Sequence, residues 1–379
     1  MIPNDLEIVN KARLLDYPTP FFYTSKEVLR HNYQTFLHLF DDSEIHYALK
    51  ANSDPKVLGY LNELGCGFEA ASIFEVDILL QLGVKPEKII YGTAVKPAAH
   101  IERAASAGIN RFAADSKEEI DKIAKIAPGS KVFIRAIVED EGSVFTMSER
   151  FGAPIETVKE LVLYLKAKGL KTYGISFYVG SQAVNTMRWA QGAQSVKPIY
   201  EQLLEEGVTL EILNLGGGYP ALYANHSETP HLKDIVKQTW NTIHTFPYMP
   251  RIIMEPGRGI VASSTVLVTE VIARTTRNGK AWLTLDAGIY NALYEAMVHQ
   301  GATNYVVHSV TTPEGEGQEL MSATLVGPTG DSLDVIARDV PLPSYIGVGD
   351  RLIFENAGAY TIAMSSAFNG FPVPELYIG

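Results

Sequence analysis

Between residues 26 and 262 the chain alternates short apolar segments with longer amphipathic ones, and this alternation restricts the fold more than any other feature. The apolar segments are rich in Ile, Val, Phe and Tyr and are short enough to be buried parallel strands. They occupy residues 44–50, 67–72, 88–92, 111–114, 131–137, 173–178, 210–216 and 251–255. Eight strands alternating with helices predict an α/β fold of the (β/α)8 TIM-barrel type. A six-strand doubly wound sheet is the structural alternative.

The pattern changes after residue 262, where strand-like pieces are separated by Gly, Pro and Asn. This spacing is typical of antiparallel β structure. Residues 19–24 (TPFFYT) have no place in the barrel, and we expect them to join the second sheet. The predicted organisation is therefore a barrel domain over residues 25–262 and a C-terminal antiparallel β domain that also takes in residues 1–24, with 263–379 as its main part.

Charge and cysteine content narrow the range of partners. The net charge of −11 disfavours nucleic acid and anionic membranes, because no basic excess is present to neutralise phosphates. A single cysteine, Cys66, excludes an intrachain disulfide and a cysteine metal site. Neither a signal peptide nor a run near the ~18 apolar residues of a membrane span is found. We expect a cytoplasmic protein without metal or membrane partner.

Polar residues recur where the predicted strands end, and in a barrel these ends meet at one mouth. Lys50 closes the first apolar segment, where desolvation would lower its pKa and favour attack on a carbonyl. The alternative is a lysine whose ammonium simply reaches the rim. The other strand-end residues are Glu69, Arg135, Tyr178, Ser181, Gly216–Gly218, Glu255 and Arg258.

Three of these features suit a flat, phosphorylated cofactor. The glycines of residues 216–218 let backbone N–H groups approach an anion, although a Gly-rich turn is the commoner explanation. Glu255 can keep a ring nitrogen protonated and Arg258 can bind phosphate; the alternative is a structural Glu255–Arg258 ion pair. Tyr178 either stacks on a cofactor ring or is a core aromatic.

At these residues the sequence resembles the group IV decarboxylases, the ornithine, lysine and diaminopimelate decarboxylases of the alanine-racemase-like fold. The similar segments run in order through nearly the whole chain: YALKANSDPKVL, GFEAASIFEV, ISFYVGSQ, LNLGGGYP, IIMEPGR, LDAG, GPTGDSLDVI, GDRLIFENAGAYT and FNGF. The resemblance implies a pyridoxal 5′-phosphate (PLP) enzyme of amino-acid metabolism and polyamine biosynthesis. It also implies a homodimer with shared active sites and a small amino-acid-type substrate.

The resemblance further implies a role for each matching residue. Lys50 would hold PLP as a Schiff base, and Glu255 would pair with the pyridine nitrogen. Glu69 and Arg135 would support the cofactor, and Asp331 would face the substrate from the second subunit. The remaining cofactor-binding residues, mostly around the phosphate, would be Ser181, Gly217, Gly218, Gly257, Arg258 and Tyr360.

The sequence departs from that family at three places. Gly330 stands where the family has the interface cysteine that returns a proton after CO2 loss, and Tyr178 stands where most members have a histidine. Residues 289–295 lack the arginine of the diaminopimelate enzymes, and His299 falls where ornithine decarboxylases carry an acidic residue. Tyr178, Lys50, His299 or water would then reprotonate the intermediate.

The sequence thus predicts a PLP-dependent carboxy-lyase, similar to ornithine and lysine decarboxylases, acting on an amino acid or an amino-acid conjugate. Gly330 and the changed residues after Asp286 favour an altered substrate or product outcome. The alternatives are a racemase, a decarboxylation-coupled oxidation, and a non-catalytic regulatory homologue.

Overall fold

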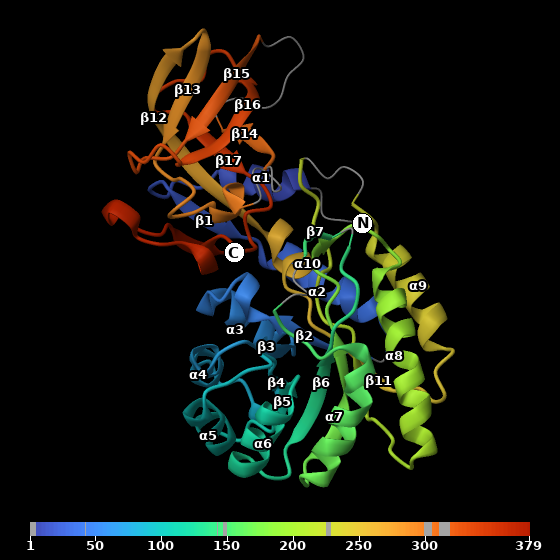
Figure 1. Cartoon of the computed structure of the whole chain (residues 1–379). Helices are drawn as coiled ribbons and strands as arrows, with labels where there is room; N and C mark the ends of the chain where they lie inside the picture. The colour runs from blue at the N-terminus through green and yellow to red at the C-terminus, as the bar shows by residue number, and fades with distance from the viewer. Residues whose placement is uncertain are drawn as a thin grey trace.

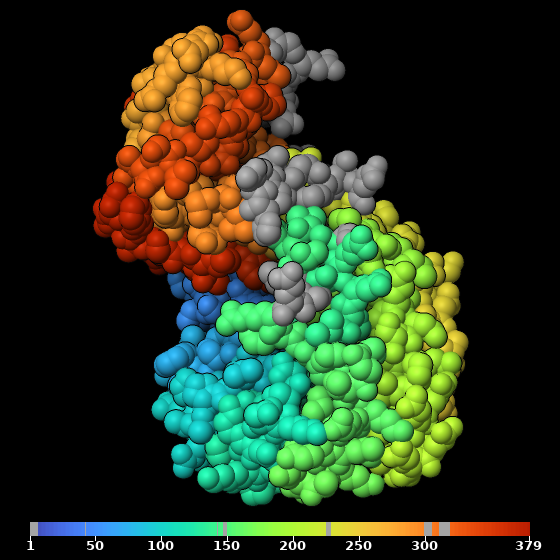
Figure 2. Space-filling model, in the orientation of Figure 1, coloured from blue at the N-terminus to red at the C-terminus, as the bar shows by residue number. Residues whose placement is uncertain are grey.

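The computed structural model describes residues 5–41, 43–141, 143–146, 150–224, 229–298, 305–310 and 319–379. It consists of a barrel surrounded by helices and a separate β domain, which lies above the barrel in Figure 1. The space-filling view shows the two parts as distinct lobes (Figure 2). In the described part of the chain, no helix has both the length and the apolar character to cross a membrane.

Eight parallel strands close into the barrel, so the TIM-barrel prediction is confirmed and the doubly wound alternative is wrong. Around the barrel the order is β10-β11-β2-β3-β4-β5-β6-β8. The strands are β2 (Glu44–Ala48), β3 (Gly67–Ala70), β4 (Ile89–Tyr91), β5 (Arg111–Ala114), β6 (Lys131–Ala136), β8 (Lys171–Phe177), β10 (Ile212–Asn214) and β11 (Arg251–Met254). Their inward side chains fill the interior with a buried cluster of Ile90, Ala113, Phe133, Tyr173, Ile212 and Ile253.

Helices pack around the barrel and begin at recognisable capping residues. Ser25, Asp54, Ser72 and Ser116 each accept a backbone N–H of the first helical turn. The helices are α2 (Lys26–Leu39), α3 (Pro55–Glu63), α4 (Ile73–Gln81), α5 (Ala98–Ser106), α6 (Lys117–Ile126), α7 (Ile155–Ala167), α8 (Arg188–Glu205), α9 (Leu232–Ile243) and the short α10 (Arg258–Val261).

The second domain is a sheet of eight strands. Its path is β14-β17-β12-β13-β15-β16, with β1 (Phe21–Thr24) paired to β12 and β18. The other strands are β12 (Thr265–Arg277), β13 (Lys280–Leu285), β14 (Val307–Ser309), β15 (Leu320–Val326), β16 (Val335–Pro343), β17 (Arg351–Phe354) and β18 (Glu375–Ile378). The expected antiparallel pairing holds except at β1–β18 and β13–β15, which are parallel. Helix α1 (Asp5–Arg13) contacts β12.

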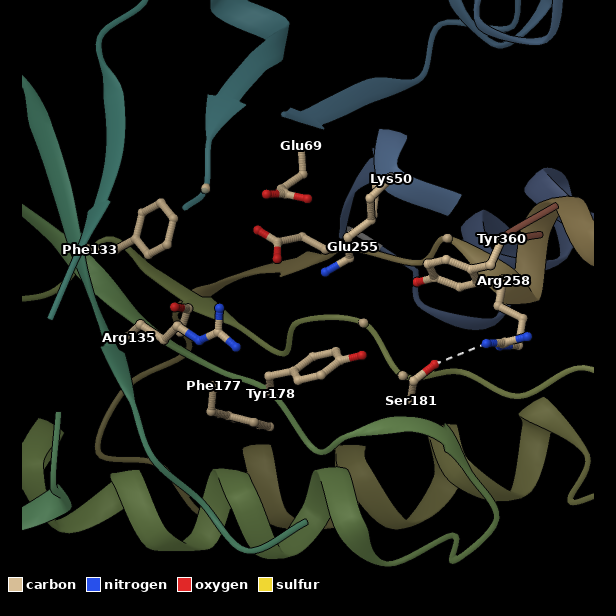
Figure 3. A pocket seen from close by; sticks show the side chains of 16 residues that line it. Lys50, Glu69, Phe133, Arg135, Phe177, Tyr178, Ser181, Glu255, Arg258 and Tyr360 are labelled. Carbon is tan, nitrogen blue, oxygen red and sulfur yellow. Dashed lines mark hydrogen bonds between the residues drawn. The ribbon is translucent and has the colours of Figure 1, made fainter. Parts of the chain in front are cut away.

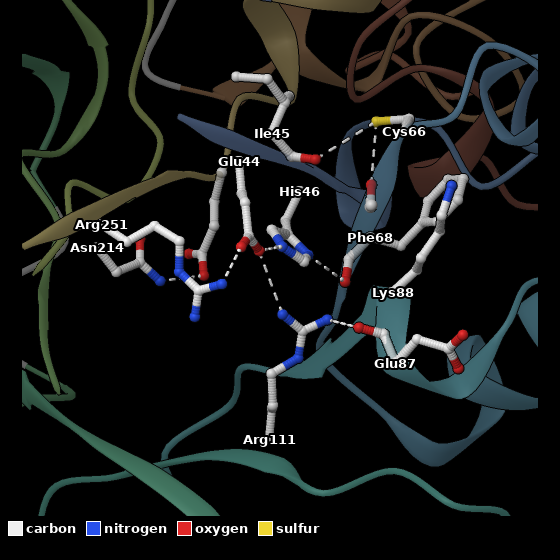
Figure 4. Close-up of polar contacts among 12 residues, drawn as sticks. Glu44, Ile45, His46, Cys66, Phe68, Glu87, Lys88, Arg111, Asn214 and Arg251 are labelled. Carbon is white, nitrogen blue, oxygen red and sulfur yellow. Dashed lines mark hydrogen bonds and ion pairs between the residues drawn. The ribbon is translucent and has the colours of Figure 1, made fainter. Parts of the chain in front are cut away.

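The amino ends of three barrel strands carry an ion-pair network (Figure 4). Glu44 Oε2 lies 3.2 Å from His46 Nε2 and 3.4 Å from Arg111 Nη1, and Glu44 Oε1 lies 2.8 Å from Arg251 Nη1. The His46 hydrogen bond and the nearby arginines lower the pKa of Glu44 to about 2. This end of a TIM barrel is opposite the catalytic face, so we attribute the network to stability.

Candidate active site

The predicted cofactor residues lie together at the carboxyl ends of the barrel strands, where they line one hollow of about 600 Å³ (Figure 3). Because all of them except Tyr360 end or closely follow barrel strands, namely β2, β3, β6, β8, β10 and β11, the barrel itself brings them together. The hollow is lined by Lys50, Glu69, Arg135, Tyr178, Ser181, Gly217, Gly218, Glu255, Gly257, Arg258 and Tyr360, together with Ala48, Gly92, Phe133, Ser176 and Phe177. Tyr360 comes from the β domain, and its N–H donates to the carbonyl of Ala51 at 2.7 Å.

Lys50 lies in a single turn, η1 (Leu49–Ala51), directly after β2, and its side chain faces the open hollow. Its Nζ is 5.3 Å from the centroid of the Tyr178 ring. Burial lowers the pKa of Lys50, but Tyr178, Tyr360 and Glu69 raise it by more, so the net pKa is above the ordinary value. The expectation of a lowered pKa is therefore wrong, because the neighbouring oxygens outweigh desolvation.

Two carboxylates face the lysine. Burial raises the pKa of Glu255 to about 7, and the nearby charge of Glu69 adds to the effect. Asn214 Nδ2 donates to Glu255 Oε1 at 2.6 Å, which fixes the orientation of this carboxylate. Burial also raises the pKa of Glu69, against the opposing effect of Lys50 and Arg135. The pair can therefore hold a proton near neutral pH beside the lysine.

Small residues make room for these groups. A Cβ added to Gly92 would lie 2.3 Å from Glu69 Oε1, so a side chain there would displace the carboxylate. At Gly218, where φ is +93°, an added Cβ would lie 2.3 Å from the carbonyl oxygen of Gly180. Only glycine fits such a left-handed, crowded turn. The glycine turn after β10 therefore presents bare backbone at the edge of the hollow.

Arg258 begins α10 and is buried beside this turn. Both of its terminal nitrogens contact the Glu295 carboxylate at 2.7 Å, and Nη1 also donates to Tyr223 Oη at 2.8 Å. Nη2 lies 3.4 Å from Ser181 Oγ (Figure 3). The structural alternative of a Glu255–Arg258 ion pair is thus wrong, because Arg258 pairs with Glu295 instead.

The arrangement at Arg258 suits a phosphate group. Among the residues that the structure describes, the buried Nε of Arg258 has no hydrogen-bond partner. An unsatisfied buried donor of this kind is costly unless a ligand meets it. The Ser181 hydroxyl, the glycine turn and the Tyr360 ring, 4.7 Å from the Arg258 guanidinium carbon, lie around the same spot. One hollow thus holds an amine, two carboxylates and a set of anion-binding groups. These match the aldehyde, the ring nitrogen and the phosphate of PLP, respectively.

Asp331 and its neighbour Gly330 line neither this hollow nor the wider one that opens onto it. Asp331 lies between β15 and β16 in the β domain, where its carboxylate accepts the N–H of Leu333 at 2.7 Å. Gly330 beside it is exposed with φ +75°. His299 lies outside the described residues. Cys66 is buried in the core, where burial raises the pKa of its thiol to about 12.

A wider outer hollow of about 1650 Å³ opens onto the first and shares Lys50, Glu69, Gly92, Arg135 and Tyr178 with it. Its remaining wall carries both signs of charge and is lined by Asp140, Glu141, Arg150, Ala71, Thr93, Thr146 and Phe151. The inner hollow therefore suits a cofactor and the outer one a polar substrate.

Comparison with known proteins agrees with this geometry. Residues 26–262 match the family described as pyridoxal-dependent decarboxylase, pyridoxal binding domain. The ornithine decarboxylase of Schizosaccharomyces pombe is 34% identical over 336 residues, which are 86% of this chain and 75% of that protein. The chain belongs to the pyridoxal-dependent decarboxylase family. The resemblance drawn from the motifs is confirmed.

Two further proteins are similar to nearly the whole chain. A crystal structure of the lysine decarboxylase of Selenomonas ruminantium in complex with PLP and cadaverine matches with a TM-score of 0.87 and 31% identity, covering 100% of this chain and 94% of that one. The antizyme inhibitor 2 of Xenopus laevis is 30% identical over 377 residues, 96% of this chain and 82% of that protein. The protein is a PLP-dependent amino-acid decarboxylase.

The sequence alone missed two kinds of residue in this decarboxylase. Asn214, which orients Glu255, and Gly92, which makes room for Glu69, are visible as a polar residue at the end of β10 and a glycine after β4. Glu295 and Tyr223 are distant from Arg258 in sequence and carried no such signal. The contact of Glu295 with Arg258 depends on how the two domains meet, whereas Tyr223 lies between β10 and α9 of the barrel itself.

Proposed function

We propose that the inner hollow binds PLP with Lys50 as the covalently bound amine and Glu255 at the ring nitrogen. The observation that carries the proposal is the gathering of Lys50, the Glu69–Glu255 pair and Arg258 around one hollow, with the Nε of Arg258 unpartnered among the described residues. Glu69 and Arg135 would support the ring, and Tyr178 would lie against it. The phosphate would be held by Ser181, Gly217, Gly218, Gly257, Arg258 and Tyr360.

When bound, PLP supplies an electron sink for the pair released as an α-carboxylate leaves. The residues of the chain would then bind and orient the cofactor and the substrate, and would move protons. Glu255, whose pKa is raised to about 7 and whose Oε1 is held by Asn214, keeps a proton at the ring-nitrogen side. Lys50 carries a proton in the cofactor-free state because its pKa is raised, and it must lose that proton to react as an amine.

The reaction ends with a proton returned to carbon, and the chain lacks the thiol that the family uses there. Gly330 has no side chain, and Cys66 is in the core with its thiol pKa raised to about 12. The proposed donors are Tyr178, Lys50 and His299. Tyr178 is favoured, because it lines both hollows and its ring centroid is 5.3 Å from Lys50 Nζ. A tyrosine acid in place of a thiol supports a changed substrate or product outcome.

A homodimer with shared active sites completes the proposal. Asp331 is half-buried in the β domain and lines neither hollow of its own subunit. Asp331 of the second subunit would then face the substrate side chain and favour a cationic or hydrogen-bonding distal group. The solved lysine decarboxylase is in complex with cadaverine, a diamine, which supports this class of product.

The test is an assay of the PLP-loaded protein with a panel of L- and D-amino acids and conjugates, measuring CO2, amine and hydrogen peroxide. We expect CO2 from at least one basic or polar amino acid, and loss of that activity in Lys50→Ala. Peroxide or a carbonyl product would identify decarboxylation-coupled oxidation. A protein that binds PLP but releases no CO2 from any candidate would overturn the proposal and leave a non-catalytic homologue, in line with its similarity to antizyme inhibitor 2.

A further inference from the structure

Glu295 forms a 2.7 Å ion pair with Arg258, which lines the hollow, although Glu295 itself does not line it. It lies in the turn η4 (Tyr294–Ala296), which follows β13 of the β domain, whereas Arg258 begins α10 after the last barrel strand. The side chains of Glu295 and Arg258 are 8% and 3% exposed, so the pair is shielded from water. The contact therefore joins the two domains directly behind the proposed phosphate position.

The hydrogen bonds of Arg258 leave one edge of the guanidinium open. The group has five N–H donors in a fixed plane. Glu295 takes the terminal edge with both Nη atoms at 2.7 Å, and Tyr223 takes a further N–H of Nη1 at 2.8 Å. On the remaining edge, Nη2 has only the 3.4 Å contact with Ser181, and Nε has no partner among the described residues. Ser181, which Nη2 contacts, lines the hollow.

We infer that Glu295 is a positioning residue for the phosphate-binding arginine. By occupying the terminal edge, it keeps the Nε–Nη2 edge turned toward Ser181, where two parallel N–H donors match two phosphate oxygens. A buried carboxylate also offsets the cost of keeping the Arg258 charge away from water before the phosphate arrives. The inference rests on the proposed placement of the phosphate at Ser181, Gly218 and Arg258.

Two alternatives predict different behaviour for Glu295. If the Glu295–Arg258 pair only stabilises the fold, its loss should lower the affinity of the hollow for every ligand to a similar extent. If Glu295 positions Arg258, its loss weakens a ligand that carries phosphate and spares one that does not. Pyridoxal, which has the ring and the aldehyde of PLP but no phosphate, separates the two.

The experiment titrates the full-length, cofactor-free protein with PLP and with pyridoxal, following the visible absorbance that forms at Lys50. We expect Glu295→Gln to weaken PLP binding on the order of tenfold, the worth of one hydrogen bond to a charged group. Pyridoxal binding should stay within about twofold of wild type. The 31P resonance of bound PLP should also shift, because the donors around the phosphate have moved.

Matched variants make the outcome decisive. Glu119→Gln breaks another buried ion pair, Glu119–Lys96 at 3.0 Å, away from the hollow, and controls for general loss of stability. Arg258→Gln should weaken PLP at least as much as Glu295→Gln, and the double variant no further. Glu295→Asp keeps a charge at shorter reach, and should weaken PLP less than Glu295→Gln; it replaces that variant should the glutamine form not fold.

The inference is overturned if Glu295→Gln binds PLP as wild type does, or if it weakens PLP and pyridoxal equally. If Arg258→Gln itself keeps wild-type affinity for PLP, the proposed phosphate site is wrong, and the failure lies with the proposed function rather than with Glu295.

Discussion

Glu255→Gln should make the cofactor-free protein more stable at alkaline pH while removing its activity. Burial and Glu69 raise the pKa of Glu255 from an ordinary 4.5 to about 7. A raised pKa means that the folded chain holds this proton more tightly than the unfolded chain. The stability it contributes is therefore complete below pH 4.5 and is lost as pH rises through about 7. Above that pH, the folded chain bears a buried carboxylate beside Glu69.

The difference between these two pKa values corresponds to roughly 3 kcal/mol, at about 1.4 kcal/mol for each tenfold change in proton affinity. Glutamine removes the charge and keeps an oxygen for Asn214, whose Nδ2 donates to Oε1 at 2.6 Å. Its new N–H2 group lacks a partner and costs part of the gain. We therefore expect Glu255→Gln to be more stable than wild type by about 1–3 kcal/mol at pH 8.5.

The assay is urea unfolding of both proteins, freed of PLP with hydroxylamine, at pH 5 and pH 8.5. At pH 5 the stability advantage of the variant should be smaller by roughly 2 kcal/mol, because Glu255 of the folded wild-type chain is then protonated. Activity of the PLP-loaded variant should fall by at least about a hundredfold, since the ring nitrogen loses its acidic partner. A stability difference that is the same at both pH values would refute the reasoning, as would a variant less stable than wild type at pH 8.5.

Three further predictions test other parts of the account. Gly92→Ala places a Cβ 2.3 Å from Glu69 Oε1, so it should displace Glu69, cost about 1–3 kcal/mol in urea unfolding and alter the absorbance of bound PLP. Glu44→Gln should lower the free energy of unfolding at pH 7 by about 1–2 kcal/mol. Because the pKa of Glu44 is lowered from 4.5 to about 2, wild type should lose this stability as pH falls through that range, and the variant should not; thermal unfolding measures both. Gly330→Cys should raise the ratio of amine to carbonyl product, because it supplies a thiol. The left-handed φ of +75° at this position should cost about 1 kcal/mol of folding stability. An unchanged product ratio would argue against the shared site.

The barrel and its site residues could be predicted from sequence because both follow local rules. Short apolar runs between capped helices mark parallel strands, and the carboxyl ends of such strands meet at one mouth. Lys50, Glu69 and Glu255 each stand at such an end, so their convergence followed from the strand count. The expected parallel barrel and separate β domain are present with only the parallel β1–β18 and β13–β15 pairs unforeseen.

The remaining features depend on contacts between distant segments. The backbone N–H of Glu119 donates to Ser116 Oγ at the start of α6, but the Glu119 carboxylate pairs with the buried Lys96 at 3.0 Å instead of completing the cap. Arg258 forms its ion pair with Glu295 and not with its sequence neighbour Glu255, because the β domain places Glu295 behind α10. The pKa of Lys50 depends on three oxygen-bearing side chains: Glu69 in β3, Tyr178 directly after β8, and Tyr360 of the β domain. Local periodicity carries no information on such pairings.

The central claim is that this hollow holds PLP through Lys50. Borohydride reduction of the PLP-loaded protein fixes the cofactor to the amine that holds it, and peptide mapping then locates that amine. We expect a pyridoxyl group on the peptide that contains Lys50 and on no other peptide, with none in Lys50→Ala. Modification of another lysine, such as the buried Lys96, or no retained cofactor in the wild-type protein, would contradict it.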